Sequence, residues 1–515
     1  MKDYLKKIIS TEQLIKKIGK FPRHKSEKVA MCHGVFDLVH PGHIRHLVFA
    51  KQKVSKLIVS ITSDIHVKKA DLRPYVPQIL RAENLAALEF IDFVIIDENE
   101  TPIKNLKKIK PDFFVKGYEY AKKETSLRTQ EEINVLKSYG GQFLFTPGDF
   151  VLSSSKIIER DKPDLSIIKL KSLMEGEKVT FSDIKETLVK FKNCEVLVVG
   201  DTIIDNYVNT SIIGNNAKTP TFSTKYINEE NFIGGAAIIA LHLKAAGAKV
   251  KFCSVLGNDS LGSFVKKELK KNKITDLTII DDVRPTTEKK YFISGEDRLL
   301  KVDKVENSPI NENLQNYIVK QIQNHKKGIV IFSDFRHGIF NQKSIQPYIK
   351  AINKGVYKVA DSQVASRWGN ILDFKNFDLI TPNEKEVRFS LADQDTAIRP
   401  LASVLFEKSN CKVLMLKLGE RGLMTVRRKI SQNDMRSFFV MDAFEKNAID
   451  PVGCGDALIS YAALSLYVSK NPLIASILGS VSAGLLSLTN GNIPILKSDV
   501  EKKLFQLENA LNSIA

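Results

Sequence analysis

Residues 29–61 read VAMCHGVFDLVHPGHIRHLVFAKQKVSKLIVSI, and this stretch sets the architecture of the first part of the chain. It begins with a short apolar run at Val29–Cys32 and turns at Gly34–Asp37. A helical stretch over 42–53 then leads to a second apolar run at Leu57–Ile61. Two buried strands joined by one helix over so few residues form a βαβ unit with parallel strands. The stretch therefore predicts an α/β domain.

The same alternation continues to about residue 160. Further helices are expected near 81–90, 102–108 and 130–139, and further strands at 93–96, 113–115 and 143–145. Residues 161–190 are rich in charge and contain the breaker Asp161-Lys162-Pro163-Asp164, which favours a linker with one or two helices. A buried run at Glu195–Gly200 begins a second α/β pattern. We predict a small doubly wound domain over 1–160, a linker over 161–190 and a second α/β domain over 191–515.

Composition supports a globular protein of more than one domain. The 515 residues exceed the size at which one hydrophobic core keeps growing. The net charge of +18 comes from lysines that are dispersed, singly or in pairs such as Lys6-Lys7. This dispersal favours a solvated basic surface that attracts anionic substrates over dedicated RNA or DNA binding.

Cysteine usage and hydropathy indicate a cytoplasmic protein. The five cysteines are scattered and form no C-x-x-C pair, so neither a disulfide framework nor a zinc ribbon is expected. The N-terminus has no apolar core of the kind found in signal peptides. The longest uncharged stretch, 471–496, is interrupted by Pro472 and Pro494, which favours a buried helix and a loop over a membrane span. No membrane partner and no nucleic-acid partner are expected.

Two histidines stand at the start of the first predicted helix, in His40-Pro41-Gly42-His43. A helix N-terminus presents free backbone N–H groups and the positive end of the helix dipole, which favours a bound phosphate. Imidazoles at i and i+3 could both donate to one phosphate during displacement at phosphorus. Three other interpretations stay open from these residues. They are a metal cluster, because four of the nine histidines lie within 33–46, a helix cap with incidental histidines, and the HxGH-like element of class I aminoacyl-tRNA synthetases.

Residues 25–160 resemble the cytidylyltransferase-like nucleotidyltransferases. The resemblance is carried by Gly34-Val35-Phe36-Asp37, by His40–His43, and by Ser153-Ser154-Ser155-Lys156-Ile157-Ile158 further along. It implies transfer of a nucleotidyl group from ATP or CTP to a phosphorylated substrate, with Mg²⁺ and release of pyrophosphate.

The resemblance also implies roles for single residues. His40 and His43 would stabilise the reacting phosphate, and Ser153, Ser154 and Ser155, at a second helix N-terminus, would hold the outer phosphates. The remaining candidate residues for binding nucleotide or phosphate are Gly34, Phe36, Asp37, Lys51, Arg73, Arg81 and Lys116. The other interpretation of the four basic ones is that they are plain surface cations.

A second phosphate-type sequence is Asp450-Pro451-Val452-Gly453-Cys454-Gly455-Asp456. An anion hole of successive backbone N–H groups needs residues small enough for a phosphate to approach, which Gly453, Cys454 and Gly455 are. A carboxylate at Asp456 could accept the proton of a sugar hydroxyl as it attacks the γ-phosphate of a nucleotide. The GxxxxGK[ST] motif is absent, so a P-loop kinase is not expected.

Residues 190–500 resemble the ribokinase/pfkB sugar kinases. Five motifs follow the order of that family: Gly200-Asp201-x-x-x-Asp205, Gly234-Gly235-Ala236-Ala237, Gly257-Asn258-Asp259, Thr381-Pro382-Asn383-Glu384-x-Glu386 and 450–456. The resemblance implies a ribokinase-like α/β domain with a small β lid. Cys454 departs from the family, which usually has alanine there.

This resemblance implies that Asp456 is the catalytic base and that Gly453, Cys454 and Gly455 form the anion hole. Asp201, Asp205, Gly234 and Gly235 would face the sugar. Asn383 and Glu386 would help to place Mg²⁺ and the phosphates, with Glu386 as the one candidate metal ligand. Lys417, Gly419 and Gly422 would border the nucleotide.

The two resemblances together are similar to the bifunctional heptose kinase/adenylyltransferases of lipopolysaccharide precursor synthesis, with the order of the two domains reversed. The stretch 213–220 departs from that family, which puts heptose 7-phosphate as substrate in doubt. We expect an enzyme that uses ATP to phosphorylate a sugar or sugar phosphate and that activates a sugar 1-phosphate as a nucleotide sugar. A polyol or other alcohol phosphate is the alternative substrate. Such kinases often pair through their lid strands, so a homodimer is also expected.

Overall fold

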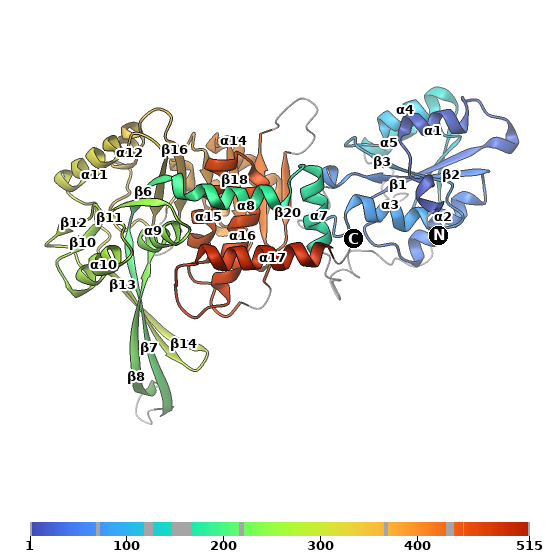
Figure 1. Cartoon of the computed structure of the whole chain (residues 1–515). Coiled ribbons are helices and arrows are strands. Elements are labelled where there is room, and N and C mark those ends of the chain that lie inside the picture. The colour runs from blue at the N-terminus through green and yellow to red at the C-terminus, as the bar shows by residue number, and fades with distance from the viewer. Residues whose placement is uncertain are drawn as a thin grey trace. The chain divides into compact units, whose positions relative to one another are not determined.

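The computed structural model describes residues 3–67, 73–117, 127–146, 166–215, 221–364, 369–428, 437–445 and 448–512. The chain separates into two compact units, Met1–Ser172 and Leu173–Ala515, which are described separately (Figure 1). Their boundary falls inside the predicted linker, within helix α7 (Ser166–Gly176).

The first unit is built on a parallel sheet in the order β3-β2-β1-β4-β5. Its strands are β1 (Val29–Gly34), β2 (Lys56–Thr62), β3 (Phe93–Asp97), β4 (Phe113–Lys116) and β5 (Gln142–Phe145). Its helices are α1 (Thr11–Ile18), α2 (Pro41–Lys51), α3 (Gln78–Ala86), α4 (Ile103–Ile109) and α5 (Leu127–Tyr139). The predicted alternation of helices and strands is present, with boundaries shifted by a few residues.

Alternating side chains of this sheet enter two separate cores, because successive residues of a strand point to opposite faces. Ala30 and Cys32 of β1 pack with α2 and α3, whereas Val29 and Met31 pack with α1, α4 and α5. Figure 1 shows helices on both sides of the sheet. Strand β1 is central, with β2 on one side and β4 on the other, so the chain reverses direction of winding here. Ligands of such sheets bind beyond the carboxyl ends of the strands at this switch point, where α2 begins.

The second unit contains a sheet in the order β11-β9-β6-β15-β16-β17-β18-β19-β20. The strands from β11 to β18 are parallel, and β19 and β20 add antiparallel. Their bounds are β6 (Glu195–Gly200), β9 (Lys249–Cys253), β11 (Thr275–Asp276), β15 (Ile329–Asp334), β16 (Tyr357–Ser362), β17 (Leu379–Ile380), β18 (Val413–Lys417), β19 (Leu423–Arg427) and β20 (Phe438–Met441). A separate parallel pair is formed by β10 (Val255–Gly257) and β12 (Ile279–Asp281).

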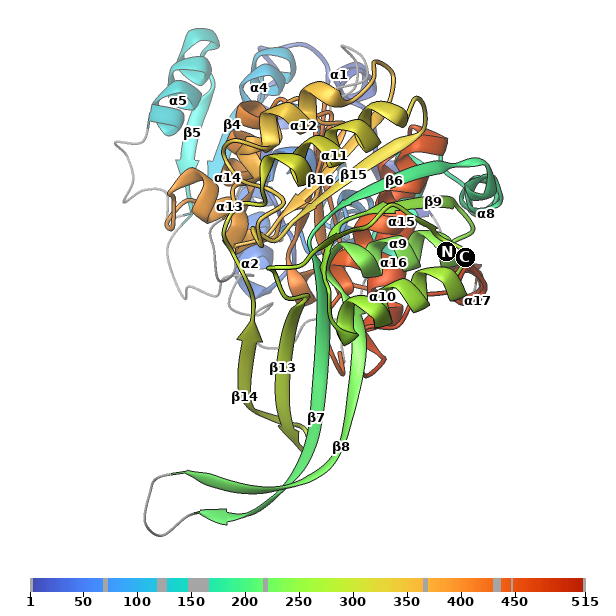
Figure 2. The same ribbon diagram turned by 90° about the vertical axis from the view of Figure 1, so that its left-hand side faces the viewer.

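Helices cover this larger sheet on both sides (Figure 2). The helices of the unit are α8 (Phe181–Lys190), α9 (Gly235–Ala245), α10 (Ser260–Lys271), α11 (Glu312–Asn324), α12 (Ile345–Ala351), α13 (Glu384–Leu391), α14 (Ile398–Ser409), α15 (Cys454–Ser469), α16 (Pro472–Ser487) and α17 (Lys497–Asn512). Helix α8 lies in the predicted linker, but it packs against α15, α16 and α17 and is part of the second unit. Its residues Phe181, Ile184 and Leu188 are buried. Helix α16 is the expected buried helix. Among the described residues, none of the helices has both the length and the apolar character needed to cross a bilayer.

A second sheet extends from the second unit as a lid, in the order β14-β13-β7-β8 (Figure 2). It contains β7 (Thr202–Asn215), β8 (Phe222–Gly234), β13 (Thr287–Ser294) and β14 (Asp297–Lys304). One row across the sheet aligns Asp303, Lys289, Asp205 and Phe232. The next row on the same face aligns Lys301, Tyr291, Tyr207 and Glu230. The lid therefore places charged side chains from separate strands side by side.

Candidate active sites

His40 is the N-cap of α2, so it lies at the positive end of the helix dipole, where a phosphate is expected to bind. Its Nδ1 accepts a hydrogen bond from Gly42 N at 3.1 Å, and Pro41 occupies the first helical position, where its missing N–H costs nothing. The His40 and His43 rings stack with their centroids 3.9 Å apart. The structure thus brings the two predicted histidines together at the helix N-terminus.

The two histidines are not chemically equivalent. Because His40 Nδ1 accepts a hydrogen bond, the proton of a neutral His40 ring sits on Nε2 and can be donated to an anion. His43 Nδ1 lies 3.1 Å from the carbonyl oxygen of Leu38, so it must be the donor there, and a neutral His43 carries no proton on Nε2. Burial, together with the neighbouring His40, lowers the pKa of His43 to about 4. His43 can therefore donate to a phosphate only after it takes up a proton.

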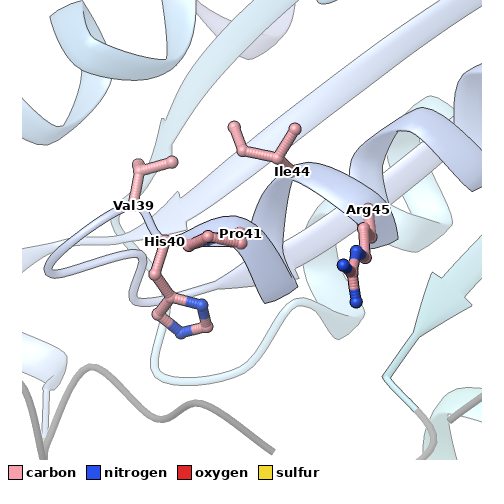
Figure 3. Close-up of a pocket in the computed structure, with 5 residues that line it drawn as sticks. All are labelled: Val39, His40, Pro41, Ile44 and Arg45. Atoms are coloured by element: carbon pink, nitrogen blue, oxygen red, sulfur yellow. The ribbon is translucent and has the colours of Figure 1, made fainter. Parts of the chain in front are cut away.

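A hollow of about 380 Å³ opens beside these histidines, lined by Val39, His40, Pro41, Ile44 and Arg45 (Figure 3). His40 and the exposed Arg45 project from the same side of α2 in this view. A cation beside a helix N-terminus increases the affinity of that place for an anion. Arg45 is not among the residues predicted from sequence. The only signal for it was its place in the second turn of the helix that follows His40, because no motif includes it.

The Gly34–Asp37 turn holds a neighbouring loop. Phe36 has a left-handed backbone (φ 49°) and packs edge-on against His43, with the ring centroids 5.0 Å apart. Asp37 is buried and accepts hydrogen bonds from the backbone N–H groups of Tyr75 and Val76 at 2.9 and 2.7 Å. Arg73 lies 3.8 Å from the same carboxylate. Phe36 is thus in contact with His43, while Asp37 holds the backbone of the loop at 73–76 and lies beside Arg73.

Three predicted basic residues have partners inside the protein. Arg81 is fully buried and donates to Val76 O, Thr62 O and Asp64 Oδ1 at 2.9, 2.8 and 2.7 Å, and also to Val35 O. It fastens the ends of β1 and β2 to α3 and is not a surface cation. Lys51 lies in the last turn of α2, about 15 Å along the helix from its first turn. Its Nζ forms an ion pair with Asp92 Oδ2 at a distance of 2.6 Å. Lys116 forms an ion pair with the buried Glu132.

The remaining histidines of the 33–46 cluster contact hydroxyl groups. His33 lies 3.0 Å from Ser60 Oγ and 3.2 Å from Thr62 Oγ1, and His46 lies 3.3 Å from Thr146 Oγ1. Within the described ranges, no group of three or more His, Cys, Asp or Glu side chains is placed to hold a metal ion. Ser153, Ser154 and Ser155 lie outside the described residues.

The second site forms where α15 begins. Gly453 is the N-cap in a left-handed conformation (φ 81°), and a Cβ added there would collide with Asn492 Oδ1. A Cβ added at Gly455 would lie 3.2 Å from Lys417 Nζ. Cys454 is half-buried, and burial raises the pKa of its thiol to about 12, so the thiol stays protonated at neutral pH. Cys454 N and Asp456 N donate to Pro451 O and Gly453 O at 3.3 and 2.9 Å. Gly453 N and Gly455 N have no acceptor among the described residues, so these two N–H groups are the ones available to a small anion.

Asp456 lies in the first turn of α15 and is only 7% exposed. Its Oδ1 has no hydrogen-bond partner among the described residues. Burial and the nearby Asp361 raise the pKa of Asp456 to about 8, against the opposing effect of Lys417. A buried carboxylate with an unpartnered oxygen and a pKa near neutrality is suited to accept a proton from a substrate.

Lys417 and Asp361 form an ion pair beside this carboxylate. Lys417 Nζ donates to Asp361 Oδ1 and Oδ2 at 3.0 and 3.1 Å, and the Thr381 hydroxyl donates to Asp361 Oδ1 at 3.1 Å. These residues come from the carboxyl ends of β16, β17 and β18, where ligands of open α/β sheets bind. Asp361 was missed by the sequence analysis, because it belongs to none of the five motifs.

Asn383 and Glu386 form the capping box of α13. Glu386 accepts from Asn383 N and from Asn383 Nδ2, both at 2.7 Å, so each of its oxygens already has a donor. Burial, with a further contribution from Asp361, raises the pKa of Glu386 to about 7. Gly419 and Gly422 form the turn between β18 and β19, with φ of 62° and 87°, and a Cβ on Gly422 would collide with Met441 O.

The residues expected to face the sugar divide into two kinds. Asp205, on the lid, is buried with a pKa raised to about 6 by burial, and Gly234 leaves room for its carboxylate. Asp201 instead accepts the backbone N–H groups of Phe335, His337 and Ile339 at 3.1, 3.2 and 3.3 Å, so it holds the loop after β15. Gly235 has a positive φ of 59°, and a Cβ added there would collide with Asp201 O, so both the backbone and the space favour glycine.

The lid also contributes cations and a contact to the anion-hole sequence that no motif indicated. Lys289 lies beside Asp205, and its burial lowers its pKa. Arg298 donates to Asp450 Oδ1 at 2.9 Å, and the Tyr207 hydroxyl donates to Asp450 Oδ2 at 2.8 Å. Asp450 also accepts from Val452 N at 3.0 Å. Two lid residues therefore hold the first residue of the turn that leads to Gly453.

Two parts of the chain match known family models. Residues 194–493, more than half of the chain, match the pfkB family carbohydrate kinases. Residues 31–160 match the cytidylyltransferase-like family. The transferase-like part therefore precedes the kinase part along the chain, as the motifs predicted.

Curated relatives that match are named bifunctional protein HldE. The protein of Helicobacter acinonychis (strain Sheeba) is 28% identical over 337 residues, which cover 62% of this chain and 69% of that protein. The protein of Aliarcobacter butzleri (strain RM4018) is 26% identical over 302 residues, covering 57% of this chain and 61% of that protein. Each alignment therefore covers only part of this chain and only part of the relative.

A solved structure shares the fold of the kinase part. The crystal structure of phosphofructokinase-2 from Escherichia coli in complex with substrates and products aligns with a TM-score of 0.52 and 16% identity. The alignment covers 61% of this chain and 99% of that enzyme. At this identity the likeness establishes a ribokinase-like α/β fold and nothing finer.

Proposed function

This chain belongs to the pfkB family of carbohydrate kinases, and we propose that its second unit transfers the γ-phosphoryl group of ATP to a hydroxyl group of a sugar or sugar phosphate. The observation that supports this most is Asp456. Its buried, unpartnered oxygen lies in the first turn of α15, directly after Gly455, whose N–H group has no acceptor among the described residues. Base and anion site are thus one residue apart, as in-line transfer to a hydroxyl requires.

In this proposal Asp456 accepts the proton of the acceptor hydroxyl as its oxygen attacks phosphorus and the bond to ADP breaks. The N–H groups around Gly453–Gly455 bind the phosphoryl group in transfer. Asp205 of the lid holds the acceptor through its hydroxyls, while Asp201 keeps the loop after β15 in place. Asn383 and Glu386 stand near the phosphates.

Mg²⁺ fits this site through the nucleotide. The described residues form no metal-binding group of their own, and both oxygens of Glu386 already accept hydrogen bonds from Asn383. When bound with ATP, Mg²⁺ would neutralise charge on the phosphates, with Glu386 as the candidate protein ligand that the family resemblance implies.

For the first unit we propose nucleotidyl transfer from ATP or CTP to a sugar 1-phosphate, with release of pyrophosphate. The stacked His40 and His43 at the start of α2 support this, together with the cytidylyltransferase-like match. Arg45 adds a cation to the same hollow. Phosphorylation and activation would then act in sequence in the synthesis of a nucleotide sugar, with a heptose-like sugar as the first candidate because the relatives are named HldE.

We also propose that the chain forms a homodimer through its lid. Apolar side chains that are exposed on β7 and β8 support this: Ile212, Ile213, Phe222, Tyr226 and Ile227. A monomer rarely exposes so many apolar residues on one hairpin. Light scattering of the wild type and of Ile213→Asp should give a dimer and a monomer, and a monomeric wild type would refute the pairing.

The central experiment incubates purified protein and Mg²⁺ with ATP or CTP and a panel of sugars, sugar phosphates and polyols. We expect ADP formation that depends on an acceptor, and pyrophosphate formation that depends on a sugar 1-phosphate. A protein that releases neither product with any member of the panel would refute the proposed function.

A further inference from the structure

Lys417 lies beside the proposed anion hole. It is the last residue of β18, and its Nζ lies 3.2 Å from the position that a Cβ of Gly455 would take. Gly455 is the second residue of α15, and Asp456 follows it. The ammonium group therefore stands next to the first turn of α15, beside the N–H group of Gly455 and one residue before Asp456.

The Lys417 side chain is held in place by a buried partner. Its two described hydrogen bonds, at 3.0 and 3.1 Å, both go to the carboxylate of Asp361, which is buried and also bound by Thr381. The side chain of Lys417 is only 14% exposed. An ammonium group has three N–H donors, so this geometry leaves one for a ligand.

We infer that Lys417 is a catalytic residue of the kinase reaction that binds the phosphoryl group in transfer, and that Asp361 is the positioning residue that aims it. The inference depends on the proposed kinase function. During transfer, a bond forms between the acceptor oxygen and phosphorus, the bond from phosphorus to ADP breaks, and the acceptor proton moves to Asp456. Lys417 stays protonated throughout and neutralises charge on the transferred group as the bond to ADP lengthens.

The pH dependence of kcat/KM, which follows the pKa of Asp456, tests the inference. An ion pair with only a structural role would not change this pH dependence. The charged groups that act on Asp456 are Asp361, Lys417, Asp205 and Lys289. Lys417 lowers the pKa of Asp456 and Asp361 raises it. Removing Lys417 should therefore move the acid limb of kcat/KM to higher pH, and neutralising Asp361 should move it to lower pH.

The test uses the full chain with the variants Lys417→Met, Lys417→Arg and Asp361→Asn. We expect Lys417→Met to lower kcat about 100-fold, the size of effect seen when one donor to a developing charge is lost. It should weaken binding of a non-hydrolysable ATP analogue much more than binding of ADP, because Lys417 meets the phosphoryl group that ADP lacks. Lys417→Arg should restore part of kcat, since it keeps the charge.

A matched control is Lys412→Met. Lys412 directly precedes β18, at the end opposite to Lys417, and its Nζ forms an ion pair with Asp378 Oδ1 at 2.7 Å, which the substitution removes. It should leave kcat and the pH profile unchanged. ADP binding and the melting temperature of each variant show whether the pocket is still folded, and Asp361→Asn offers a second approach if Lys417→Met unfolds.

Several results would overturn the inference while the wild type remains an active kinase. They are a Lys417→Met enzyme with kcat within twofold of the wild type, equal losses of ADP and ATP-analogue binding, or acid limbs that move in the same direction in Lys417→Met and Asp361→Asn. A wild type without any phosphoryl transfer would instead refute the proposed function.

Discussion

The N-termini of α2 and α15 are both proposed to bind phosphate, but the side chains beside them differ in whether they donate or accept protons. Each helix begins at the carboxyl edge of a parallel sheet and presents the positive end of its dipole there, which favours a bound phosphate. At α2 the flanking groups are His40, His43 and Arg45, all able to donate when protonated. At α15 they include Asp456, whose oxygen accepts.

The difference follows from the attacking group in each proposed reaction. A sugar 1-phosphate attacks through an oxygen that is already ionised, so the first site needs donors but no base. A sugar hydroxyl has to lose a proton, so the second site needs a carboxylate beside the anion hole. Helix N-termini thus supply the phosphate binding, and the side chains set the chemistry.

The strongest way to break this comparison is Asp456→Asn. Because an amide cannot accept the proton, we expect kinase kcat to fall about 1,000-fold or more, within the range for loss of a general base. Pyrophosphate release by the first unit should not change. Parallel assays of ADP and pyrophosphate on one preparation measure both, and a fall in both rates would contradict separate sites.

His40→Ala is the reciprocal change. His40 is the residue that can donate from Nε2 while neutral, so its loss should reduce nucleotidyl transfer about 100-fold, as for other donors to a developing charge. Kinase activity serves as the internal control. His40→Asn, which can still cap the helix, separates loss of the cap from loss of the donor.

The protonation of His43 predicts that NTP binding by the first unit depends on pH. Its pKa of about 4 in the free protein should rise when an anionic phosphate binds, so binding takes up a proton. Between the free and bound pKa values, NTP affinity should then fall as pH rises, by up to about tenfold per unit.

Calorimetry in two buffers of different ionisation enthalpy measures this proton uptake. His43→Gln, which cannot titrate, is the control. Equal uptake by the variant and the wild type would assign the proton to another group.

Arg298→Ala tests whether the lid supports the anion hole. It removes a donor to Asp450, which also holds Val452 N, so the turn before Gly453 should loosen. We expect kinase kcat to fall about tenfold, the cost of about one charge-assisted hydrogen bond. Tyr207→Phe should have a smaller effect, since it leaves the ion pair intact. Steady-state kinetics with saturating ATP would show no change if the lid does not act on this turn.

The smallest effect is expected at Cys454. Its thiol has a pKa of about 12, so it should react slowly with iodoacetamide at pH 7. Cys454→Ala should leave kinase kcat within about twofold, because alanine fits the same volume. Rapid inactivation of the wild type, but not of Cys454→Ala, by the reagent would show that the thiol is reactive.

Much of the fold was predictable, because strand and helix periodicities are local properties of the chain. The βαβ pattern of 29–61 and the buried helix in 471–496 are both present. Arg81 shows the limit of local reasoning. A basic residue near a phosphate motif is read as a ligand, but the fold encloses it among carbonyl groups. Asp201 similarly accepts backbone N–H groups of the loop after β15, a contact that no motif spacing indicated.

The sequence alone determined where phosphates are expected to bind, because glycines, histidines and a carboxylate at the start of a helix create an anion site from neighbouring residues. Only the tertiary structure decided what surrounds those sites. Asp361 and Lys417 meet because parallel strands end at one edge, and Asp205 and Lys289 meet through the register of the lid. Such contacts depend on strand pairing between distant segments, which no local spacing encodes.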